Sequence, residues 1–464
     1  MKRNYEIDMC NGPILGKLIQ FAIPLMLSGV LQLLFNAADI IVVGRYTGSD
    51  ALAAVGATSA LNNLIVNIFI GLSIGSSVVM ARYYGAQDWK NVSDVVHTSV
   101  LLSFISGVFL IFAGIALARP LLLLTGTPEN VIDQSVLYMR IIFCGMPSLM
   151  VYNFGAAILR AVGDTKRPLF FLTISGLINV ALNLFFVIVF EMGVSGVAIA
   201  TIISQFVSAI LVVLCLIKSP GNYKLYLKQL KIHKEKLIEI IKVGLPAGVQ
   251  GAVFSISNVL IQSSINSFGS IAVAGNTAAS NIEGFVYTSM NSLYQASLSF
   301  TSQNMGAKKY NRIVPILIRS LVMVFVIGAV LGGGAFLFGH ELLGIYSKDA
   351  QVIEYGISRM AVVCLTYYLC GMMDVCCGSI RGLGYSVVPT VVSLVGACGL
   401  RIVWIYTIFA LNRTLTTLYI SYPVTWGITF AAHLICFIVF LRKIKKNNPP
   451  ANEETNLQSE AVNA

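Results

Sequence analysis

Hydrophobic residues in this chain gather in about twelve long runs that are separated by short polar connections. A helix needs roughly 20 apolar residues to cross the hydrocarbon core of a bilayer, and the runs reach that length. The pattern therefore predicts twelve membrane-spanning helices, with boundaries uncertain by about four residues. We expect them at 17–44, 52–80, 93–117, 132–159, 168–190, 194–217, 238–267, 272–301, 313–338, 352–380, 387–411 and 416–441.

The composition supports the same interpretation. Of the 464 residues, 56% are hydrophobic and only 11% are charged, and the mean hydropathy is +0.81. A soluble domain carries about a quarter charged residues. The chain is therefore predicted to be an all-α integral membrane protein.

The basic residues are distributed unevenly along the chain. Of 31 Lys and Arg, 24 lie in the N-terminus, in alternate connections with their helix ends, and in the C-terminal tail. The other connections hold little beyond Arg45, Arg119, Lys348 and Arg413. This is the positive-inside pattern, and it predicts that both termini are cytoplasmic. The net charge of +11 thus reflects orientation and attraction to anionic lipid, and nucleic acid is not an expected partner.

The two halves of the chain repeat one another. RAVGDTKRP at 160–168 aligns with RGLGYSVVP at 381–389, and YGAQDWKN at 84–91 aligns with MGAKKYNR at 305–312, both at a shift of 221 residues. Two further blocks agree with this shift to within one residue. Each copy contains six runs, so both copies enter the membrane in the same orientation, as parallel repeats do. Two six-helix lobes that face each other enclose a cleft, which is the architecture of a transporter.

The repeat also predicts the domain organisation. We expect an N-terminal lobe at 1–217 and a C-terminal lobe at 237–442. The basic stretch at 218–236 is interpreted as a cytoplasmic linker that includes an amphipathic helix. The polar tail at 443–464 is expected to be disordered.

Asp39 is the most informative single residue. It lies in LFNAADIIVVGRY, a segment that is otherwise suited to lipid, and shares one helix face with Gln32 and Asn36. A carboxylate at membrane depth costs about 2.5–3.5 kcal/mol, so a functional role is the first hypothesis. The alternatives are a hydrogen bond that packs two helices together, or an interfacial Asp near Arg45.

Further polar residues recur at helical spacing in other runs, among them pairs of amides four residues apart. Such residues either join helices by hydrogen bonds or line a shared pocket. The complete set of candidate substrate- or ion-binding residues is Gln32, Asn36, Asp39, Asn63, Asn179, Asn183, Asn258, Gln262, Glu283, Tyr287 and Asp374. Two pairs nearer the outer helix ends, Asp133 with Arg140 and Glu354 with Arg359, are expected to be ion pairs or interfacial charges.

Two prolines fall inside predicted helices. Pro24 and Pro246 each free a backbone carbonyl and can bend the helix. A bend at Pro24 would reorient the polar face that ends at Asp39, so both prolines are candidate hinges, with a static kink as the alternative.

Several activities lack their motifs in the sequence. The only Gly-Lys pair, Gly16-Lys17, is followed by Leu18, so no nucleotide-binding P-loop is present. The four histidines are scattered and no HExxH motif occurs, so no resident metal site or cofactor is expected. No Ser/His/Asp arrangement suggests an enzyme.

Over 14–441 the sequence resembles the multidrug and toxic compound extrusion (MATE) transporters of prokaryotes. The segments that carry the resemblance are AIPLMLSGVLQLLFNAADIIVVGR, LRAVGDTKRP, NVALNLFFVIVFEMGVSGVAIATIIS, NIEGFVYTSMNSLYQASLSFTSQNMGAKK and IRGLGYSVVP. The resemblance implies twelve helices in two lobes that form a V-shaped bundle, and export of organic, often cationic, drugs or toxins against inward proton or sodium flow. It also implies a multi-pass protein of the bacterial cytoplasmic membrane that acts in drug resistance, and we expect a monomer.

The resemblance extends to single residues. Asp39 matches the family's carboxylate in helix one, Pro24 its bending proline and Asn179 its polar residue in helix five. Asn183 stands where many prokaryotic members have Asp. Helix seven holds only amides and hydroxyls where some members have Glu, which argues against a sodium site of that type and leaves a Na⁺ near Asp39 as the alternative.

The second half departs from other members at one acidic position. Asp374 lies about one turn from the helix-ten Asp of some members, whereas Glu283, in NIEGF, fits the branch that this sequence resembles.

The expected mechanism is alternating access in which Asp39 holds either a coupling ion or a cationic substrate. The main alternative is a flippase of the same superfamily for lipid-linked oligosaccharides or other amphiphiles. It would require a strongly cationic cavity, whereas the membrane-depth charges in the polar stripes are acidic. A major-facilitator transporter shares the layout but has a GxxxDRxGRR-type loop where this chain has YYGAQDWKN.

Overall fold

The computed structural model describes residues 5–448, and within them every regular element is helical. The side chains of four positions in the first part of α2, residues 49, 50, 52 and 60, lie outside the description. The first half of the chain forms α1 (Ile14–Tyr46), α2 (Ser49–Gly85), α3 (Trp89–Leu124), α4 (Glu129–Cys144), α5 (Met146–Ala161), α6 (Lys166–Leu184), η1 (Phe185–Val189) and α7 (Gly193–Lys218). The second half forms α8 (Lys234–Asn266), α9 (Ser270–Gly306), α10 (Tyr310–Leu337), α11 (Gly339–Tyr346), α12 (Ala350–Gly382), α13 (Val387–Ser393), η3 (Leu394–Gly399), α14 (Leu400–Tyr406), α15 (Ile408–Leu411) and α16 (Leu415–Asn447).

The described helices provide eleven apolar spans and one polar one. Ten are long and apolar enough to cross a membrane, and α4 with α5 forms an eleventh span that is bent by 47°. The twelfth predicted run, 272–301, corresponds to α9, which is 37 residues long but falls below that hydropathy. Many Ser, Thr and Asn side chains of α9 are buried against α12, α10, α2 and α1, where protein replaces lipid.

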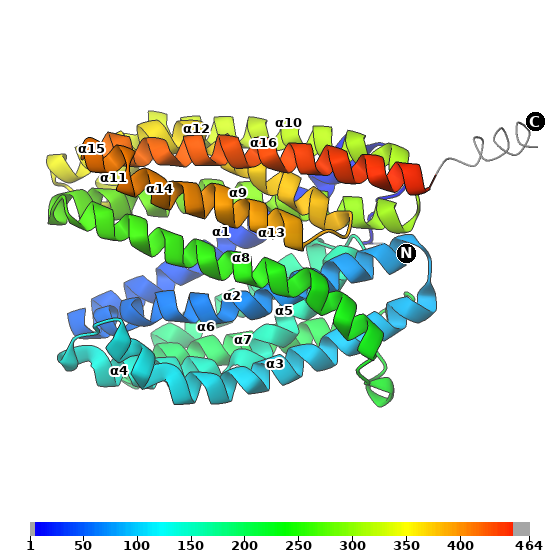
Figure 1. The fold of residues 1–464 in the computed structure, drawn as a ribbon. Helices are drawn as coiled ribbons and strands as arrows, with labels where there is room; N and C mark the ends of the chain where they lie inside the picture. The colour runs from blue at the N-terminus through cyan, green and yellow to red at the C-terminus, as the bar shows by residue number, and fades with distance from the viewer. Residues whose placement is uncertain (1–4, 449–464) are drawn as a thin grey trace, which may run out of the picture.

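The helices form two groups with α1 and α8 between them (Figure 1). The helices α2–α7 lie in the lower part of the view and α9–α16 in the upper part. The first residues of the chain and the last turn of α16 lie at the same end of the molecule, which we call the terminal end; the opposite end is the distal end.

The helix α1 passes from one group to the other. Near its start, Leu18 and Phe21 pack with Phe300 of α9, and the two phenyl rings meet edge to face at 5.6 Å. Near its end, Val42 and Val43 pack in a cluster with valines of η1 and α7. The helix α8 packs along α2 of the first group, and near its end Gln262 binds Asn276 of α9 in the second group. Both α1 and α8 therefore contact the two groups.

Two pairs of glycines bring α2 and α8 into close contact. Gly71 and Gly75 of α2 face Gly244 and Gly248 of α8. A Cβ atom on Gly71 would lie 2.2 Å from the Gly248 nitrogen, so no larger residue fits without separating the helices. We call this contact the glycine seam.

The segment before α1, residues 5–13, closes the terminal end from outside, and we call it the N-terminal strap. Its Glu6 carboxylate accepts hydrogen bonds from the hydroxyls of Tyr84 in α2, at 2.8 Å, and Tyr223, at 2.9 Å. Both tyrosines belong to the first half of the chain.

The next residues of the strap bind the second half. The Met9 carbonyl accepts a hydrogen bond from Asn304 of α9 at 3.0 Å, and the Cys10 carbonyl accepts one from Lys309 at 3.2 Å. The N-terminal strap therefore holds the two groups together at this end.

Some predicted boundaries were wrong. The expected linker helix is only a short 3₁₀ turn, Leu227–Gln229, and α8 begins at Lys234. The helix α16 continues to Asn447, so the first residues of the expected disordered tail are helical, while 449–464 lie outside the described residues. Pro24 and Pro246 lie inside α1 and α8, as predicted from the sequence, while their role as hinges stays a prediction.

Candidate functional site

Asp39 lies in the last third of α1 and is half-buried. Its carboxylate accepts a hydrogen bond from the Asn183 amide of α6. The amides continue the chain of contacts: Asn183 donates to Asn179 at 3.4 Å, and Asn179 donates to the Thr201 hydroxyl of α7 at 3.4 Å. The structure thus brings together three of the predicted site residues.

The Asp39 carboxylate has no positively charged partner in the described part of the chain. No Lys, Arg or His nitrogen of residues 5–448 lies within 4.0 Å of it. The Oδ1 atom of Asn183 is buried beside it without a hydrogen-bond donor. Buried polar atoms are normally satisfied, so these oxygens form an acceptor site that can take up a proton or a cation.

The helix α1 has two exposed faces of opposite character. Leu27, Leu34 and Ile41 recur every seven residues along one exposed apolar face. Gln32 and Asn36 are also exposed but lie on the opposite side of the helix, in line with Asp39. Exposed amides of this kind are better suited to water than to lipid.

Asn63 of α2 and Asn258 of α8 are exposed as well, and Gln262 is half-buried. Gln262 lies in the C-terminal third of α8 and accepts a hydrogen bond from Asn276 of α9 at 3.2 Å. The structure therefore places Gln262 in a network of the second half, away from Asp39.

Glu283 forms an ion pair that sequence spacing did not predict. Arg359 of α12 donates to both carboxylate oxygens, at 2.8 and 2.6 Å, and donates to Asn276 at 2.7 Å. All three side chains are buried. The expected pair of Glu354 with Arg359 is wrong, and Glu283 does not present a free carboxylate.

Aromatic rings enclose this ion pair. The Arg359 guanidinium lies 5.6 Å from the ring centre of Tyr419 and 5.4 Å from that of Tyr422. The Arg401 guanidinium also lies over Tyr422, 4.2 Å from its ring centre. Arg401 donates to the Thr425 hydroxyl at 3.3 Å. Cation–π contacts and the ion pair make this region a structural centre of the second half.

The other outer pair was also assigned wrongly. Asp133 binds Arg119 at 3.0 Å, with both side chains exposed, and not Arg140. Such exposed pairs contribute about 0–1 kcal/mol, so this one has little effect on the fold.

Asp374 of α12 is, after Asp39, the second of the three predicted membrane-depth carboxylates without a basic partner. It is half-buried, and no basic nitrogen of the described residues lies within 4.0 Å of it. Tyr287, an exposed residue of α9, stacks on Tyr367 at 6.3 Å, which in turn stacks on Trp426 at 5.3 Å. Stacked rings of this kind suit flat or cationic organic molecules.

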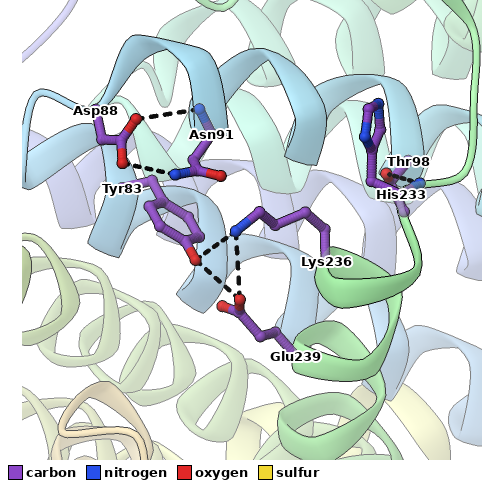
Figure 2. Close-up of polar contacts among 7 residues, drawn as sticks. All are labelled: Tyr83, Asp88, Asn91, Thr98, His233, Lys236 and Glu239. Carbon is purple, nitrogen blue, oxygen red and sulfur yellow. Dashed lines mark hydrogen bonds and ion pairs between the residues drawn. The ribbon is translucent and has the colours of Figure 1, made fainter.

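The terminal end carries a separate polar cluster that ties α8 to α2 (Figure 2). The Lys236 amine donates to the Tyr83 hydroxyl at 2.5 Å and lies 3.4 Å from the Glu239 carboxylate, which also accepts from Tyr83 at 2.8 Å. The sequence pattern placed Lys236 in the linker at 218–236 and Glu239 in the following run, and gave neither residue a role.

Sequence reasoning also missed two structural features. The glycine seam had a signal, because GLSIG and GLPAG both place glycines four residues apart, a spacing that lets membrane helices approach closely. Arg381 donates to Tyr294 at 2.8 Å and to Gln250 at 2.8 Å, and so joins α12, α9 and α8. No local pattern predicts such a contact. In residues 5–448, no group of three or more His, Cys, Asp or Glu is placed to hold a metal ion.

These features define a multi-pass helical membrane protein with polar and charged groups inside a two-part bundle. The comparisons identify its family. The chain belongs to the MatE family: the family model matches residues 24–185 and matches again at 246–407, which together cover more than half of the chain. The second match begins 222 residues after the first (246 − 24), in agreement with the repeat in the sequence.

Curated relatives match most of the chain. It is 28% identical over 417 residues to "Probable multidrug resistance protein YoeA" of Bacillus subtilis, covering 88% of this chain and 90% of that protein. It is 26% identical over 387 residues to "Probable multidrug resistance protein NorM" of Thermotoga maritima, with 82% of each chain covered. It is 21% identical over 426 residues to "Multidrug export protein MepA" of Staphylococcus saprophyticus, covering 91% of this chain and 93% of that one.

Solved structures show the same fold. One, described as the outward-facing conformation of a multidrug resistance MATE family transporter of the MOP superfamily, superposes with a TM-score of 0.89 at 22% identity, covering 96% of this chain and all of that one. A MOP superfamily transporter from Pyrococcus furiosus superposes equally well at 23% identity, with the same coverage. The predicted fold class, two six-helix repeats in an all-α membrane protein, is confirmed.

Proposed function

We propose that this protein is a cation-coupled antiporter that exports organic, often cationic, compounds by alternating access. The observation that carries the proposal is the Asp39 carboxylate, which lies at the end of a polar helix face, binds only an amide and has no basic partner within residues 5–448. The relatives named as multidrug export proteins support the substrate class.

Coupling follows from competition for one charge. A carboxylate that has bound a proton or Na⁺ no longer attracts a cationic substrate, and a bound substrate displaces the coupling ion. One proton exchanged for one monovalent cation moves no net charge, so the pH gradient alone drives it, at about 1.4 kcal/mol per pH unit. A second coupling ion adds about 2.3 kcal/mol per 100 mV.

Asp374 is the candidate for that second ion, because Glu283 is held by Arg359. The stacked rings next to Asp374 offer a surface for the apolar part of a substrate. We therefore assign ion and substrate binding to Asp39 and Asp374 and a structural role to Glu283.

Proton and sodium stay as alternatives for the coupling ion. The unsatisfied Asn183 oxygen next to Asp39 favours Na⁺, since hard cations take oxygen ligands. A proton needs only the carboxylate.

The terminal end is assigned to the cytoplasm, because most Lys and Arg residues lie in the connections at this end. The glycine seam and the N-terminal strap then close the cytoplasmic side, while the exposed Gln32 and Asn36 lie toward the opposite side. Inward opening requires both contacts to separate. We place the protein as a monomer in the bacterial cytoplasmic membrane.

A lipid-linked oligosaccharide or amphiphile flippase is the second candidate. Three buried arginines of the second half, Arg359, Arg381 and Arg401, favour it, because a pyrophosphate head group needs cations. Arg359 and Arg381 are engaged with protein groups, which favours the antiporter.

The test is efflux of a fluorescent organic cation, such as ethidium, from cells that express Asp39→Asn. We expect loss of efflux and of drug resistance with unchanged expression and thermal stability. Asp133→Asn, which changes an exposed carboxylate in the same way, is the matched control and should transport normally. Full efflux by Asp39→Asn at normal expression would remove Asp39 from the mechanism.

A further inference from the structure

The linker between α7 and α8, residues 219–233, folds back against the first turns of α3. Its Tyr226 backbone N–H donates to His97 at 3.1 Å, and the Tyr226 ring stacks on the His97 imidazole at 6.4 Å. Its His233 backbone N–H donates to the Thr98 hydroxyl at 3.1 Å (Figure 2). These bonds fix the linker in place although it contains only one short helical turn.

A cavity of about 430 Å³ lies between the linker and α3. Its polar lining includes Ser93, His97, Lys228, Lys231 and His233. Asp94 also lines it, but its carboxylate lies 3.4 Å from the His233 ring.

The cavity is rich in unneutralised positive charge. Lys228 and Lys231 are exposed, and within residues 5–448 neither has an acidic oxygen within 4.0 Å. Two ammonium groups and a hydroxyl around one space are donors for a phosphate group, whereas both ring nitrogens of His97 are already bonded, to the Tyr226 N–H and the Ser93 carbonyl.

The position of the cavity relative to the membrane identifies the source of that phosphate. Apart from Trp89 at the start of α3, exposed large apolar side chains begin at Phe104 on α3 and at Ile238 on α8, so the cavity lies just outside the apolar belt, at the level of lipid head groups. Tyr226 and Leu227 beside it are 47% and 56% exposed. Exposed apolar residues at this depth contact lipid, which a free phosphate ion would not explain.

We propose that this cavity binds the head-group phosphate of an anionic phospholipid in the membrane leaflet at the terminal end. The lipid phosphate lies between Lys228 and Lys231, and Tyr226 and Leu227 contact the glycerol and upper acyl region. The inference is independent of the antiporter proposal, because it concerns binding and can be measured without transport.

The experiment is native mass spectrometry of the full-length protein in neutral detergent, titrated with phosphatidylglycerol or phosphatidylcholine. We expect specific binding of phosphatidylglycerol and about a tenfold or greater loss of its affinity in Lys228→Gln/Lys231→Gln, since each such lysine contributes substantially to anionic-lipid binding. Lys445→Gln/Lys446→Gln removes two exposed charges from the end of α16 and is the matched control.

Three outcomes would overturn the proposal. Equal loss in both double variants, or equal binding of the two lipids, would reduce the effect to general electrostatics and overturn the site. Millimolar inorganic phosphate that displaces the lipid completely would show a free-anion site and overturn the lipid assignment. Thermal melting of both variants should match that of the unmodified protein, because all four lysines are exposed.

Discussion

Arg359 donates two hydrogen bonds to the Glu283 carboxylate, from Nε at 2.8 Å and from Nη2 at 2.6 Å. Both side chains are almost completely buried. Of the three carboxylates that the sequence places deep in the membrane, one is therefore neutralised within the protein. Asp39 and Asp374 have no such partner, so their carboxylates are available to bind a ligand.

Breaking this pair should destabilise the protein more than removing it. Glu283→Gln and Arg359→Gln each leave one uncompensated buried group, and we expect a loss of about 3–5 kcal/mol for either. The double variant removes both charges and should recover much of the loss. Thermal melting in detergent checks this, and single variants that melt like the unmodified protein would contradict the structural role of Glu283.

Asn183 should act by orienting the Asp39 carboxylate. Asn183→Leu removes the amide that donates to Asp39 and its unsatisfied oxygen. A hydrogen bond to a charged group is worth about 1.5–3 kcal/mol. If Na⁺ is the coupling ion, its apparent affinity should fall roughly 10- to 100-fold, because the amide oxygen and the ordered carboxylate are lost. If a proton is the coupling ion, its apparent affinity should rise, because the amide donor favours the charged carboxylate. Transport rates measured against coupling-ion concentration check this.

The conservative variant separates orientation from packing at this position. Asn183→Asp keeps the side chain's size and should retain transport with an altered ion dependence. An unchanged ion dependence in Asn183→Leu would exclude a positioning role for Asn183.

Glu6 should hold the terminal end closed. Glu6→Ala removes two hydrogen bonds from Tyr84 and Tyr223, each worth about 1.5–3 kcal/mol to a charged acceptor. The opening equilibrium should then shift by about tenfold or more toward the inward-open state. Hydrogen–deuterium exchange should accelerate in the turns at 84–91 and 304–312.

The matched control for the strap is Glu129→Ala, an exposed glutamate at the start of α4. It should leave exchange in both turns unchanged. Exchange rates in Glu6→Ala that equal those of the control would show that the strap does not restrain the lobes.

We predict that Asp164, at the terminal end, makes the stability of the folded protein depend on pH. It lies in the turn between α5 and α6, fully buried, and burial raises its pKa to about 6 although the Arg167 backbone N–H and guanidinium oppose this. In the unfolded chain the pKa is about 4. The folded state therefore binds more protons between these values, and its stability rises as the pH falls from about 7 toward 4.

The measurement compares the melting temperature of the unmodified protein with that of Asp164→Asn at pH 7.5 and at pH 5. The difference between the two proteins should move in favour of the unmodified one at the lower pH, because the variant has no carboxyl group to protonate. A difference that does not change with pH would contradict the assignment.

The sequence predicted the helical elements well, because apolar runs and the repeat act over long stretches of chain. It did not predict the breaks, such as the bend between α4 and α5 or the π-helical turn η3. Such breaks depend on how neighbouring helices pack and leave no distinct apolar pattern.

The site was predicted in part. Asn179 and Asn183 were recognised by their four-residue spacing, and packing of α6 on α1 brings them to Asp39. The partner of Arg359 was predicted wrongly. Glu354 is near Arg359 in sequence, but two residues five positions apart in a helix point in different directions, so their side chains do not meet. The true partner, Glu283, comes from a helix that only the tertiary fold places beside it.

The most direct test of the central claim is substrate-dependent ion uptake in liposomes that contain the purified protein. Proton uptake should be followed with a pH-sensitive dye, with and without sodium, for the unmodified protein, Asp39→Asn and Asp133→Asn. We predict that a cationic substrate moving one way drives protons or sodium the other way in the unmodified protein and in Asp133→Asn, and that Asp39→Asn abolishes the exchange. Coupled exchange by Asp39→Asn at the unmodified rate would contradict the claim that this carboxylate alternates between ion and substrate.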